Sequence, residues 1–412
     1  MAGDPRKRSA VAADAQAIAR WRNAIIVAFG LGGITVATWG PRLPAIRAEL
    51  AVGTGTIGVL VACSTVGSTL GLLAARYALH RMGGRGAVLT ALLVMASGLA
   101  MMGVGVSSRS VAVVGVGFTI VGLGLGSLDV SINVEGAAAE RAAGRTLLPL
   151  MHACWSAGAA TGAGIGALCA AAGIRPGVQF LLLAALVAVI GLASARGIPP
   201  ETPEEAQASG PDPWLLRIRR WLRGWTDARL LLIGLVLLGV EFGEGSANNW
   251  MSLGVRQSHS RSAAVAALFL TLFAVSEAST RAAAGPLVDR HGRVRIVRFT
   301  TALGIGGIAL FVLAHAIWLV AIGVVLWAVG VSMGYPLAMS AAAEGDDPAT
   351  QVSVAASIGY QASLVGPPVI GFLAQAVGLL SSLWLLAILF VTAFAAAGSL
   401  MPAMDRRGAR AT

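Results

Sequence analysis

The sequence predicts an all-α membrane protein with twelve transmembrane helices in two pseudo-symmetric six-helix bundles. Of its 412 residues, 56% are hydrophobic and only 12% are charged, whereas a soluble domain carries about 25% charged residues. Apolar runs of about 20 residues, long enough to cross a bilayer, recur along nearly the whole chain. The two halves of the chain also repeat each other at a nearly constant offset. These three observations predict the fold class.

Twelve apolar runs mark the expected helices. Each run is long enough to span a membrane and contains few charges. They cover approximately residues 23–42, 55–79, 86–106, 110–136, 148–172, 177–196, 228–252, 263–286, 296–315, 317–341, 353–376 and 380–401.

The internal repeat divides the chain into two similar halves. HRMGGR at 80–85 aligns with DRHGR at 289–293 at an offset of 209, and the same offset places His152 opposite Gln361. Parallel repeats of this kind are typical of secondary transporters, whose binding site lies at the repeat interface near the middle of the membrane.

Five segments follow from the spans and the repeat. In the linker, WLLRIRRWLRGW predicts a basic amphipathic helix on the inner membrane surface, with a solvated loop as the alternative. The segments are a cytoplasmic tail (1–22), an N-terminal bundle (23–196), a cytoplasmic linker (197–227), a C-terminal bundle (228–401) and a cytoplasmic tail (402–412).

The basic residues indicate the orientation of the helices. The net charge is +11, and the arginines concentrate in alternate connections, such as 81–85, 217–223 and 289–298. An excess of basic residues marks cytoplasmic loops, so both termini are expected to be cytoplasmic. This pattern favours a multi-pass protein of a bacterial inner membrane over a nucleic-acid-binding protein.

A loop motif carries a family resemblance. GPLVDRHGRVR, between the eighth and ninth spans, contains Gly285, Asp289, Arg290, Gly292 and Arg293 in the spacing of a known transporter signature. With the twelve spans and the duplication, the chain resembles the major facilitator superfamily. The resemblance implies the major facilitator fold and a gating role for this loop.

The N-terminal copy of the motif is degraded. It keeps Arg81, Gly83 and Arg85, but His80 and Arg76 stand where the family has Asp and Gly. We therefore expect a weaker latch in this half of the protein.

Two signatures of drug–proton antiporters are absent. Phe118 stands where those proteins carry Arg in the fourth span, and the fifth span lacks their Gly-Pro pair. RLPAIR (42–47), SLDVSINVEGAAAER (127–141) and EFGEGSANNW (241–250) are instead similar to a branch near the fucose-permease-type sugar–proton symporters. That resemblance implies proton coupling through a carboxylate of the fourth span, either Asp129 or Glu135.

The seventh span carries the strongest candidate site. Glu241, Glu244 and Asn248 share one helical face by their spacing, and Asn249 follows. A carboxylate inside a bilayer costs roughly 2.5–3.5 kcal/mol, so such groups usually face a bundle interior or a watery cavity. We expect this face to bind a proton and a polar ligand. The alternative is that Glu244 and the Asn pair cap the outer helix end.

Other polar residues extend the candidate site. Asp129 and Asn133 share a face of the fourth span, and His152 lies at a similar depth on the fifth, which permits an Asp–His proton relay. A hydrogen-bonded structural histidine is the alternative for His152. Its repeat partner Gln361 is expected to contact the same cavity.

Five further residues have mainly structural or gating expectations. Glu277 and Arg281 are spaced for an intrahelical ion pair in the eighth span, and the alternative for Arg281 is a pair with a glutamate of the seventh span. Glu140 is expected to pair with loop arginines. Trp39 and Trp250 end spans on the outer side, where interfacial anchoring is the usual role and stacking on a sugar is the alternative.

No pattern typical of an enzyme occurs: there is no phosphate-binding loop, metal-ligand cluster or nucleophilic triad. We predict a monomeric, proton-coupled symporter that moves a sugar or sugar derivative without cofactor or metal. The alternatives are a proton-driven exporter of drugs or natural products and a non-transporting membrane receptor on a transporter fold.

Overall fold

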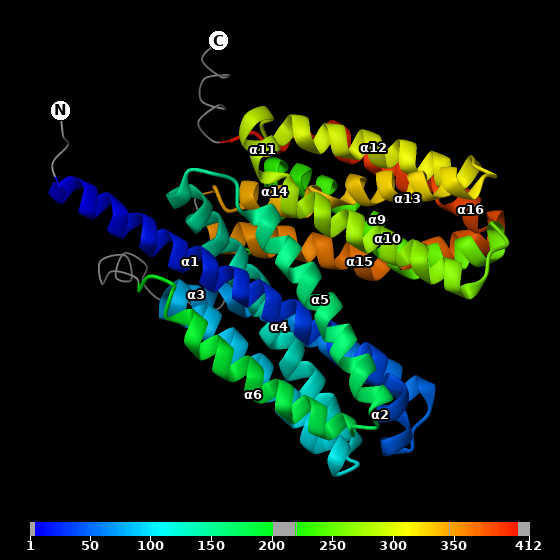
Figure 1. The fold of residues 1–412 in the computed structure, drawn as a ribbon, viewed down its shortest axis with the longest axis horizontal. Helices are drawn as coiled ribbons and strands as arrows, with labels where there is room; N and C mark the ends of the chain where they lie inside the picture. The colour runs from blue at the N-terminus through cyan, green and yellow to red at the C-terminus, as the bar shows by residue number, and fades with distance from the viewer. Residues whose placement is uncertain (1–4, 201–218, 220, 346, 403–412) are drawn as a thin grey trace. The chain divides into compact units, whose positions relative to one another are not determined.

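The computed structural model describes residues 5–200, 219, 221–345 and 347–402, and these residues form helices and turns with no strand (Figure 1). The predicted all-α fold class is confirmed. By their internal contacts the helices fall into two compact units. Unit 1 contains Met1–Gly144 and Cys154–Pro213, and unit 2 contains Arg145–Ala153 and Trp214–Thr412.

Unit 1 is built from helices that pack side by side. α3 covers two of the expected spans. Gly83 marks the kink between them, with φ 67° and ψ 173°, a conformation that glycine tolerates. The helices are α1 (Pro5–Thr38), the short η1 (Gly40–Arg42), α2 (Leu43–Leu50), α3 (Thr54–Ser107), α4 (Val111–Ala143), α5 (Leu148–Ala171) and α6 (Pro176–Ala195).

Unit 2 contains the remaining helices and also the first residues of α5. The helices are α9 (Ala228–Leu253), η2 (Gly254–Ser258), α10 (Ala263–Ala283), α11 (Gly285–His291), α12 (Arg293–Leu313), α13 (Ile317–Ser332), α14 (Gly334–Ala342), α15 (Pro348–Val377), α16 (Leu379–Ser382), α17 (Trp384–Ala396) and η3 (Ala397–Leu400).

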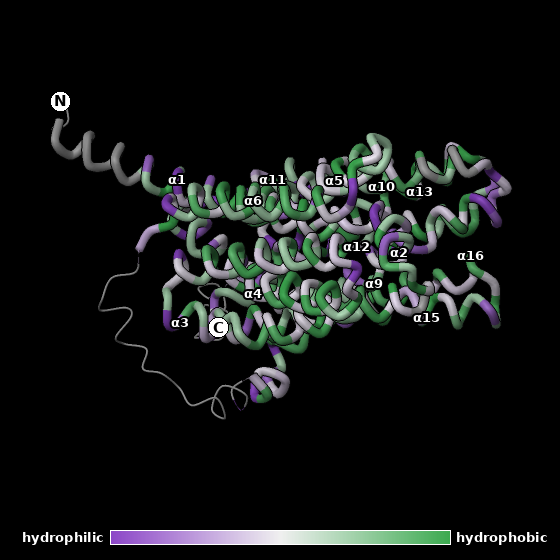
Figure 2. The backbone as a smooth tube through the Cα atoms, turned by 90° about the horizontal axis from the view of Figure 1, so that it is seen from below, coloured by the Kyte–Doolittle hydropathy of each residue, from purple (hydrophilic) through white to green (hydrophobic). Residues whose placement is uncertain are grey.

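The spans of the structure account for the twelve expected ones. Within the described residues, nine helical stretches are long and apolar enough to cross a membrane, and the longest, Thr56–Ser107, covers the second and third expected spans. α10 and α15 cover the expected eighth and eleventh spans. Figure 2 shows hydrophobic residues along the helices and hydrophilic residues gathered mainly near their ends.

Local sequence signals explain several helix ends. Asp227 accepts hydrogen bonds from the amides of Arg229 and Leu230 and so caps the start of α9, and Ser110 caps α4 in the same way. Gly144 ends α4 in the left-handed conformation. These caps satisfy amides and carbonyls that have no partner inside the helix.

Glycines allow α3 and α4 to pack with their backbones in contact. A Cβ added to Gly67 would overlap the carbonyl of Thr119, and one added to Gly122 would overlap the carbonyl of Ser64. Gly71 and Gly126 repeat this arrangement one turn further along. Small residues four positions apart are the usual means of close helix packing in membranes.

The limits of the two units differ from the limits of the segments expected from the sequence. Residues 145–153, which the sequence places in the N-terminal bundle, group with unit 2. α1 begins at Pro5, so the expected N-terminal tail is largely helical. Half of the predicted surface helix at 214–225, namely 214–218 and 220, lies outside the described residues, and the sequence-based segment limits stay predictions.

Candidate functional site

A buried ionic cluster lies between α9 and α10 of unit 2. Arg281 of α10 places its Nη2 atom 2.9 Å from Oε2 of Glu244 on α9 and 2.6 Å from Oε1 of Glu277, one turn earlier on α10. The structure therefore contains the Glu277–Arg281 ion pair that the spacing predicts. It also contains the alternative pair of Arg281 with a glutamate of the seventh span, and this pair joins the two helices.

Burial makes this cluster unusual. Arg281 is 5% exposed and Glu277 is 6% exposed, while Glu244 is partly accessible. An ionic group removed from water is stable only when it is paired and hydrogen-bonded. The shared guanidinium therefore holds two carboxylates of different exposure in one place.

A helix break gives Arg281 a further partner. α13 ends at Ser332, and Pro336 four residues later has no amide hydrogen to donate to the Ser332 carbonyl. The Nε of Arg281 donates to that carbonyl at 3.1 Å. The guanidinium is therefore oriented by α9, α10 and the end of α13 together.

Glu241 lies one turn before Glu244 and faces α15. It accepts a hydrogen bond of 2.8 Å from the hydroxyl of Ser363, and it lies within electrostatic range of Arg281. The α15 backbone approaches closely here, because a Cβ added to Gly359 would be 3.4 Å from the Glu241 side chain. Three carboxylates thus gather around one guanidinium.

His152 and Tyr335 extend the polar region of unit 2. Their rings meet edge to face with centroids 5.3 Å apart, and His152, which is 7% exposed, lies within electrostatic range of Arg281. Tyr335 also lies beside Gly359. An imidazole, a phenol and a serine hydroxyl therefore accompany the carboxylates.

The residues near the C-terminal end of α9 have different surroundings. Asn248 and Asn249 are exposed, and the Asn249 amide donates to the Gly245 carbonyl of its own helix at 2.7 Å. The indole N–H of Trp250 donates to the Pro367 carbonyl of α15 at 3.0 Å. Trp250 therefore links α9 to α15. Gln361, also on α15, is exposed.

In unit 1, Asp129 and Asn133 form a buried pair on α4. The Asn133 amide donates to the Asp129 backbone carbonyl at 2.8 Å and to its carboxylate at 3.2 Å. Asp129 and His152 belong to different units, so the Asp–His relay stays a prediction. Trp39 is 8% exposed and packs edge to face on Phe118, with ring centroids 5.6 Å apart.

Glu135 of α4 lies among residues of the predicted cytoplasmic end of unit 1. It accepts a hydrogen bond of 2.9 Å from the Trp21 indole of α1 and lies against Gly84 of the degraded motif. Gly83 makes the turn of this motif, and Arg81 lies over the Tyr77 ring at 5.5 Å. Arg85 is partly buried, and Glu140 is 7% exposed.

The complete loop motif in unit 2 binds Thr146, in the connection just before α5. The Asp289 carboxylate accepts hydrogen bonds from both the backbone amide, at 2.8 Å, and the hydroxyl of Thr146. Gly292 adopts φ 79° between α11 and α12, and Arg293 pairs with Glu344 at 2.6 Å. Arg290 is exposed, and a Cβ on Gly285 would be 3.0 Å from the Thr146 carbonyl.

The sequence did not predict three residues that lie at or near the ionic cluster: Ser332, Ser363 and Tyr335. Ser332 contributes a backbone carbonyl, and Ser363 is a common residue that no spacing singles out. Tyr335 offered a signal, because the chain has only three tyrosines and this one stands between Gly334 and Pro336 in an apolar span. No group of acidic, histidine or cysteine residues suited to a metal ion occurs in the described part of the chain.

Comparison with protein families identifies the chain. The model of the Major Facilitator Superfamily matches residues 24–362 and 233–411. The chain belongs to the Major Facilitator Superfamily. It is therefore a multi-pass transporter-type membrane protein and not an enzyme.

Bacterial relatives support this assignment over most of the chain. A transporter of Sinorhizobium fredii is 28% identical over 366 residues, 86% of this chain and 91% of the relative. An MFS-type transporter of Yersinia pestis is 24% identical over 373 residues, 90% of this chain and 93% of the relative. The membrane protein MosC of Rhizobium meliloti is 22% identical, over 87% of this chain and 84% of MosC.

Solved structures share the fold at low sequence identity. The transporter FucP in its outward conformation matches with a TM-score of 0.76 and 15% identity, over 92% of this chain and 98% of FucP. The human organic anion transporter MFSD10 matches with a TM-score of 0.67 and 17% identity, over 92% of this chain and 99% of MFSD10. This likeness shows the major facilitator fold.

Proposed function

We propose that this protein is a proton-coupled symporter that carries a small polar solute, such as a sugar or sugar derivative, across the bacterial inner membrane. The observation that carries the proposal is the gathering of Glu241, Glu244 and Glu277 around Arg281 inside a membrane-spanning unit. One solved structure of the same fold is named a fucose:proton symporter. We further propose that the protein acts as a monomer with both termini cytoplasmic.

The charge balance of the cluster supports proton binding. One guanidinium neutralises one carboxylate, and neighbouring buried carboxylates resist ionising together. A proton on one of them reduces the excess negative charge, and its release restores that charge. Because Glu244 and Glu277 compete for one Nη2 atom, protonating either one lets Arg281 pair fully with the other.

This exchange of partners supplies a physical link to conformation. Arg281 joins α10 to α9 through Glu244 and to the end of α13 through Ser332. A proton on Glu244 weakens the contact between α9 and α10 and leaves the pair within α10. Alternating access requires such a change in helix contacts between the loaded and unloaded states.

The neighbouring groups support a hydroxylated solute. Ser363 and Tyr335 carry hydroxyls, His152 carries a ring nitrogen, and the aromatic ring of Tyr335 offers an apolar face. Glu241 is within hydrogen-bonding distance of Ser363, so solute binding and proton binding share partners. Asp129 on α4 is a second candidate for proton transfer, with Asn133 beside it.

The test is solute-driven proton uptake in liposomes that contain the purified full-length protein and a pH-sensitive dye. A panel of monosaccharides that includes fucose is added in turn. We expect at least one sugar to drive proton movement by the wild-type protein. Four single variants are then compared with it: Glu241→Gln, Glu244→Gln, Glu277→Gln and Asp129→Asn. At least one cluster variant should lose proton movement tenfold or more and retain sugar exchange at equal concentrations on both sides.

Glu49→Gln on α2 is the matched control, since it removes a carboxylate away from the cluster and should leave proton movement unchanged. Proton movement that survives all four substitutions contradicts the coupling assignment. Sugar binding without flux in the wild-type protein would indicate a receptor, and proton-driven efflux of amphipathic compounds would indicate an exporter.

A further inference from the structure

The accessible groups of the ionic cluster in unit 2 differ in charge from the buried ones. Glu241 and Glu244 on α9 are partly exposed, and so are Tyr335 and Ser363 beside them. Arg281, the cation of the cluster, is only 5% exposed. A solute that reaches this site therefore meets two carboxylates and two hydroxyls, while the guanidinium is buried.

Gly359 on α15 brings an aromatic ring and a carboxylate to the same point. A Cβ added to Gly359 would lie 3.0 Å from the Tyr335 ring and 3.4 Å from the Glu241 side chain. Ser363, one turn further along α15, donates a hydrogen bond of 2.8 Å to the Glu241 carboxylate. A carboxylate attracts a cation by its charge, and an aromatic ring attracts one by its quadrupole. This part of the site is therefore suited to a positively charged group.

The anions of the cluster also outnumber its cation. Glu241, Glu244 and Glu277 all lie within electrostatic range of Arg281, so with every group ionised these four side chains carry two more negative charges than positive ones. Oε1 of Glu277 lies 2.6 Å from the guanidinium, yet it accepts no hydrogen bond from the described residues. A coupling proton removes one surplus charge. A second positive charge is needed to remove the other, because unbalanced anions in a buried site are costly.

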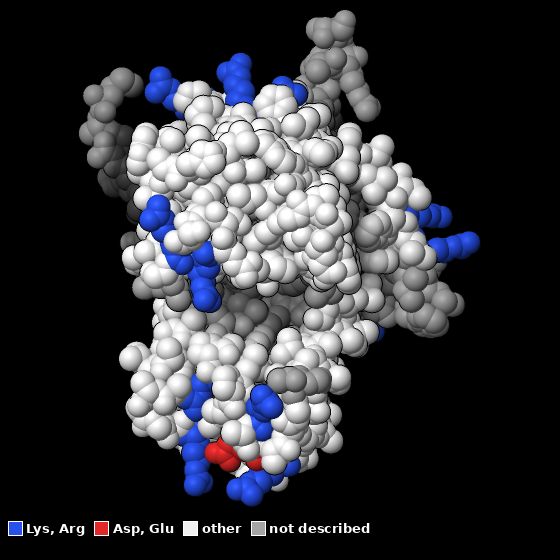
Figure 3. Space-filling model, turned by 90° about the vertical axis from the view of Figure 1, so that its right-hand side faces the viewer, with Lys and Arg blue, Asp and Glu red and all other residues white. Residues whose placement is uncertain are grey.

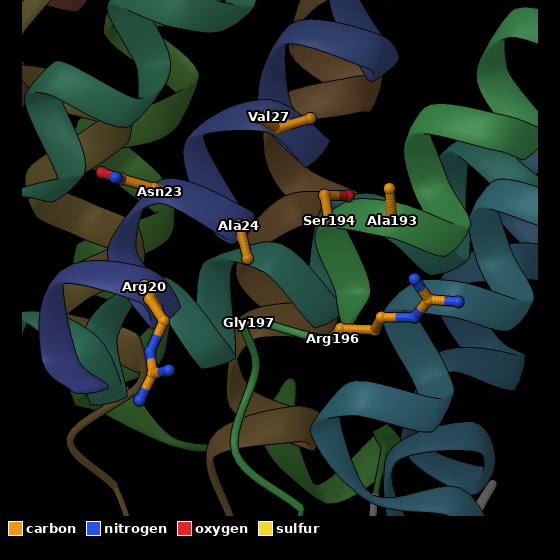
Figure 4. A pocket seen from close by; sticks show the side chains of 8 residues that line it. All are labelled: Arg20, Asn23, Ala24, Val27, Ala193, Ser194, Arg196 and Gly197. Atoms are coloured by element: carbon orange, nitrogen blue, oxygen red, sulfur yellow. The ribbon is translucent and has the colours of Figure 1, made fainter. Parts of the chain in front are cut away.

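A group of charges on unit 1 shows the opposite arrangement. Arg20 and Arg196 line an open pocket between α1 and α6, and Figure 4 shows their side chains pointing away from each other on opposite sides of Gly197. These two guanidiniums do not converge on a common binding position. In the ionic cluster, by contrast, Glu241 and Glu244 come from adjacent turns of one helix face and lie near the same guanidinium.

We propose that the transported solute carries a primary amine beside its hydroxyls, as an amino sugar does, and that its ammonium binds at Glu241 beside the Tyr335 ring. Glu244, one turn away on α9, adds to the negative potential at this position. An ammonium has three hydrogen-bond donors, which match carboxylate oxygens, and the hydroxyl of Ser363 serves the hydroxyls of the solute. This inference rests on the proposed function, since it names the solute class of the same site.

Isothermal titration calorimetry of the purified full-length protein in a neutral detergent tests the proposal. The probes are glucosamine, galactosamine and mannosamine, each compared with its parent sugar and its N-acetyl form at a pH at which the amine is protonated. We expect at least one amino sugar to bind about tenfold or more tightly than both of its neutral forms, because only the ammonium is attracted by charge to the carboxylate.

Variants separate charge from shape. Glu241→Gln should remove most of the preference for the amine, and Glu241→Asp should retain part of it. Ser363→Ala should weaken binding of the amino sugar and of its parent by the same factor, since it removes a hydroxyl and no charge. Glu49→Gln on α2, which removes a carboxylate away from the cluster, should leave the preference unchanged.

Equal binding of every amino sugar and its parent overturns the inference, and so does a preference that survives Glu241→Gln. In either case the proposed function still stands if a neutral sugar drives proton movement in liposomes. Preferred binding of an amino sugar without any proton movement supports the inference and contradicts the coupling. Displacement of the bound amino sugar by sodium as readily as by a second amino sugar would assign the site to an inorganic cation and overturn the inference. Failure of every probe to bind contradicts both proposals.

Discussion

Arg281 is a buried guanidinium inside an apolar helical unit, and its presence there depends on the anions beside it. Its two carboxylate partners lie at 2.6 and 2.9 Å, and its third partner is a carbonyl that Pro336 leaves without a helical donor. Removing one partner of a buried ion pair leaves an uncompensated charge, which usually destabilises more than the pair itself stabilises.

We predict that Arg281→Met lowers the free energy of unfolding by about 3–5 kcal/mol. The loss follows because Glu244 and Glu277 then share a buried site without a cation. Thermal unfolding of the detergent-solubilised protein, followed by circular dichroism, measures it. Arg281→Met/Glu277→Gln should recover part of the stability, since it removes one orphaned charge. Equal stability of the wild-type and Arg281→Met proteins would show that the guanidinium does not hold the cluster together.

At the scale of helices, backbone contact between α3 and α4 holds unit 1 together. Gly67 and Gly71 on α3 meet carbonyls of α4, and Gly122 and Gly126 on α4 meet carbonyls of α3. In a bilayer, association of helices depends on such close packing, because the lipid is as apolar as the side chains. A side chain at these positions separates the two helices.

Gly67→Val and Gly122→Val should each destabilise unit 1 by about 1–3 kcal/mol through overpacking. Unfolding in mixed micelles with increasing SDS provides the measurement. Gly58→Val is the matched control on α3, because a Cβ there meets no atom within 4 Å and the helix-propensity change is the same. Equal destabilisation at positions 58 and 67 would attribute the effect to propensity instead of helix contact.

At the scale of the whole molecule, charge is sparse and unevenly distributed. The face shown in Figure 3 is mostly uncharged, with separate basic groups and a small acidic patch. In the sequence, the arginine-rich connections alternate with connections that hold only scattered arginines. Because basic loops remain on the cytoplasmic side, this alternation predicts the orientation of every helix.

Single-cysteine labelling tests the predicted orientation in a variant in which Cys63, Cys154 and Cys169 are replaced by Ala. Ser258→Cys, at the end of η2, should react with a membrane-impermeant maleimide in intact spheroplasts. His291→Cys, in the arginine-rich loop, should react only after the membrane is opened. Both positions are exposed, so accessibility to the reagent is limited by the membrane. The reverse pattern would place both termini outside.

The sequence by itself determined the fold class, the family motif and the identity of the unusual polar residues. Apolar length, glycine spacing and a fixed loop signature are local properties, so Asp289, Gly292 and the Glu277–Arg281 pair were predictable. The resemblance to sugar–proton symporters also rests on such local motifs.

Only the tertiary structure decided which glutamate of the seventh span meets Arg281 and which partner the other one takes. A single helical face placed Glu241 and Glu244 together, yet in the structure Glu241 turns to Ser363 and Glu244 to Arg281. Packing of α9 against both α10 and α15 sets these partners, and contacts between distant segments leave no periodic signal in the sequence.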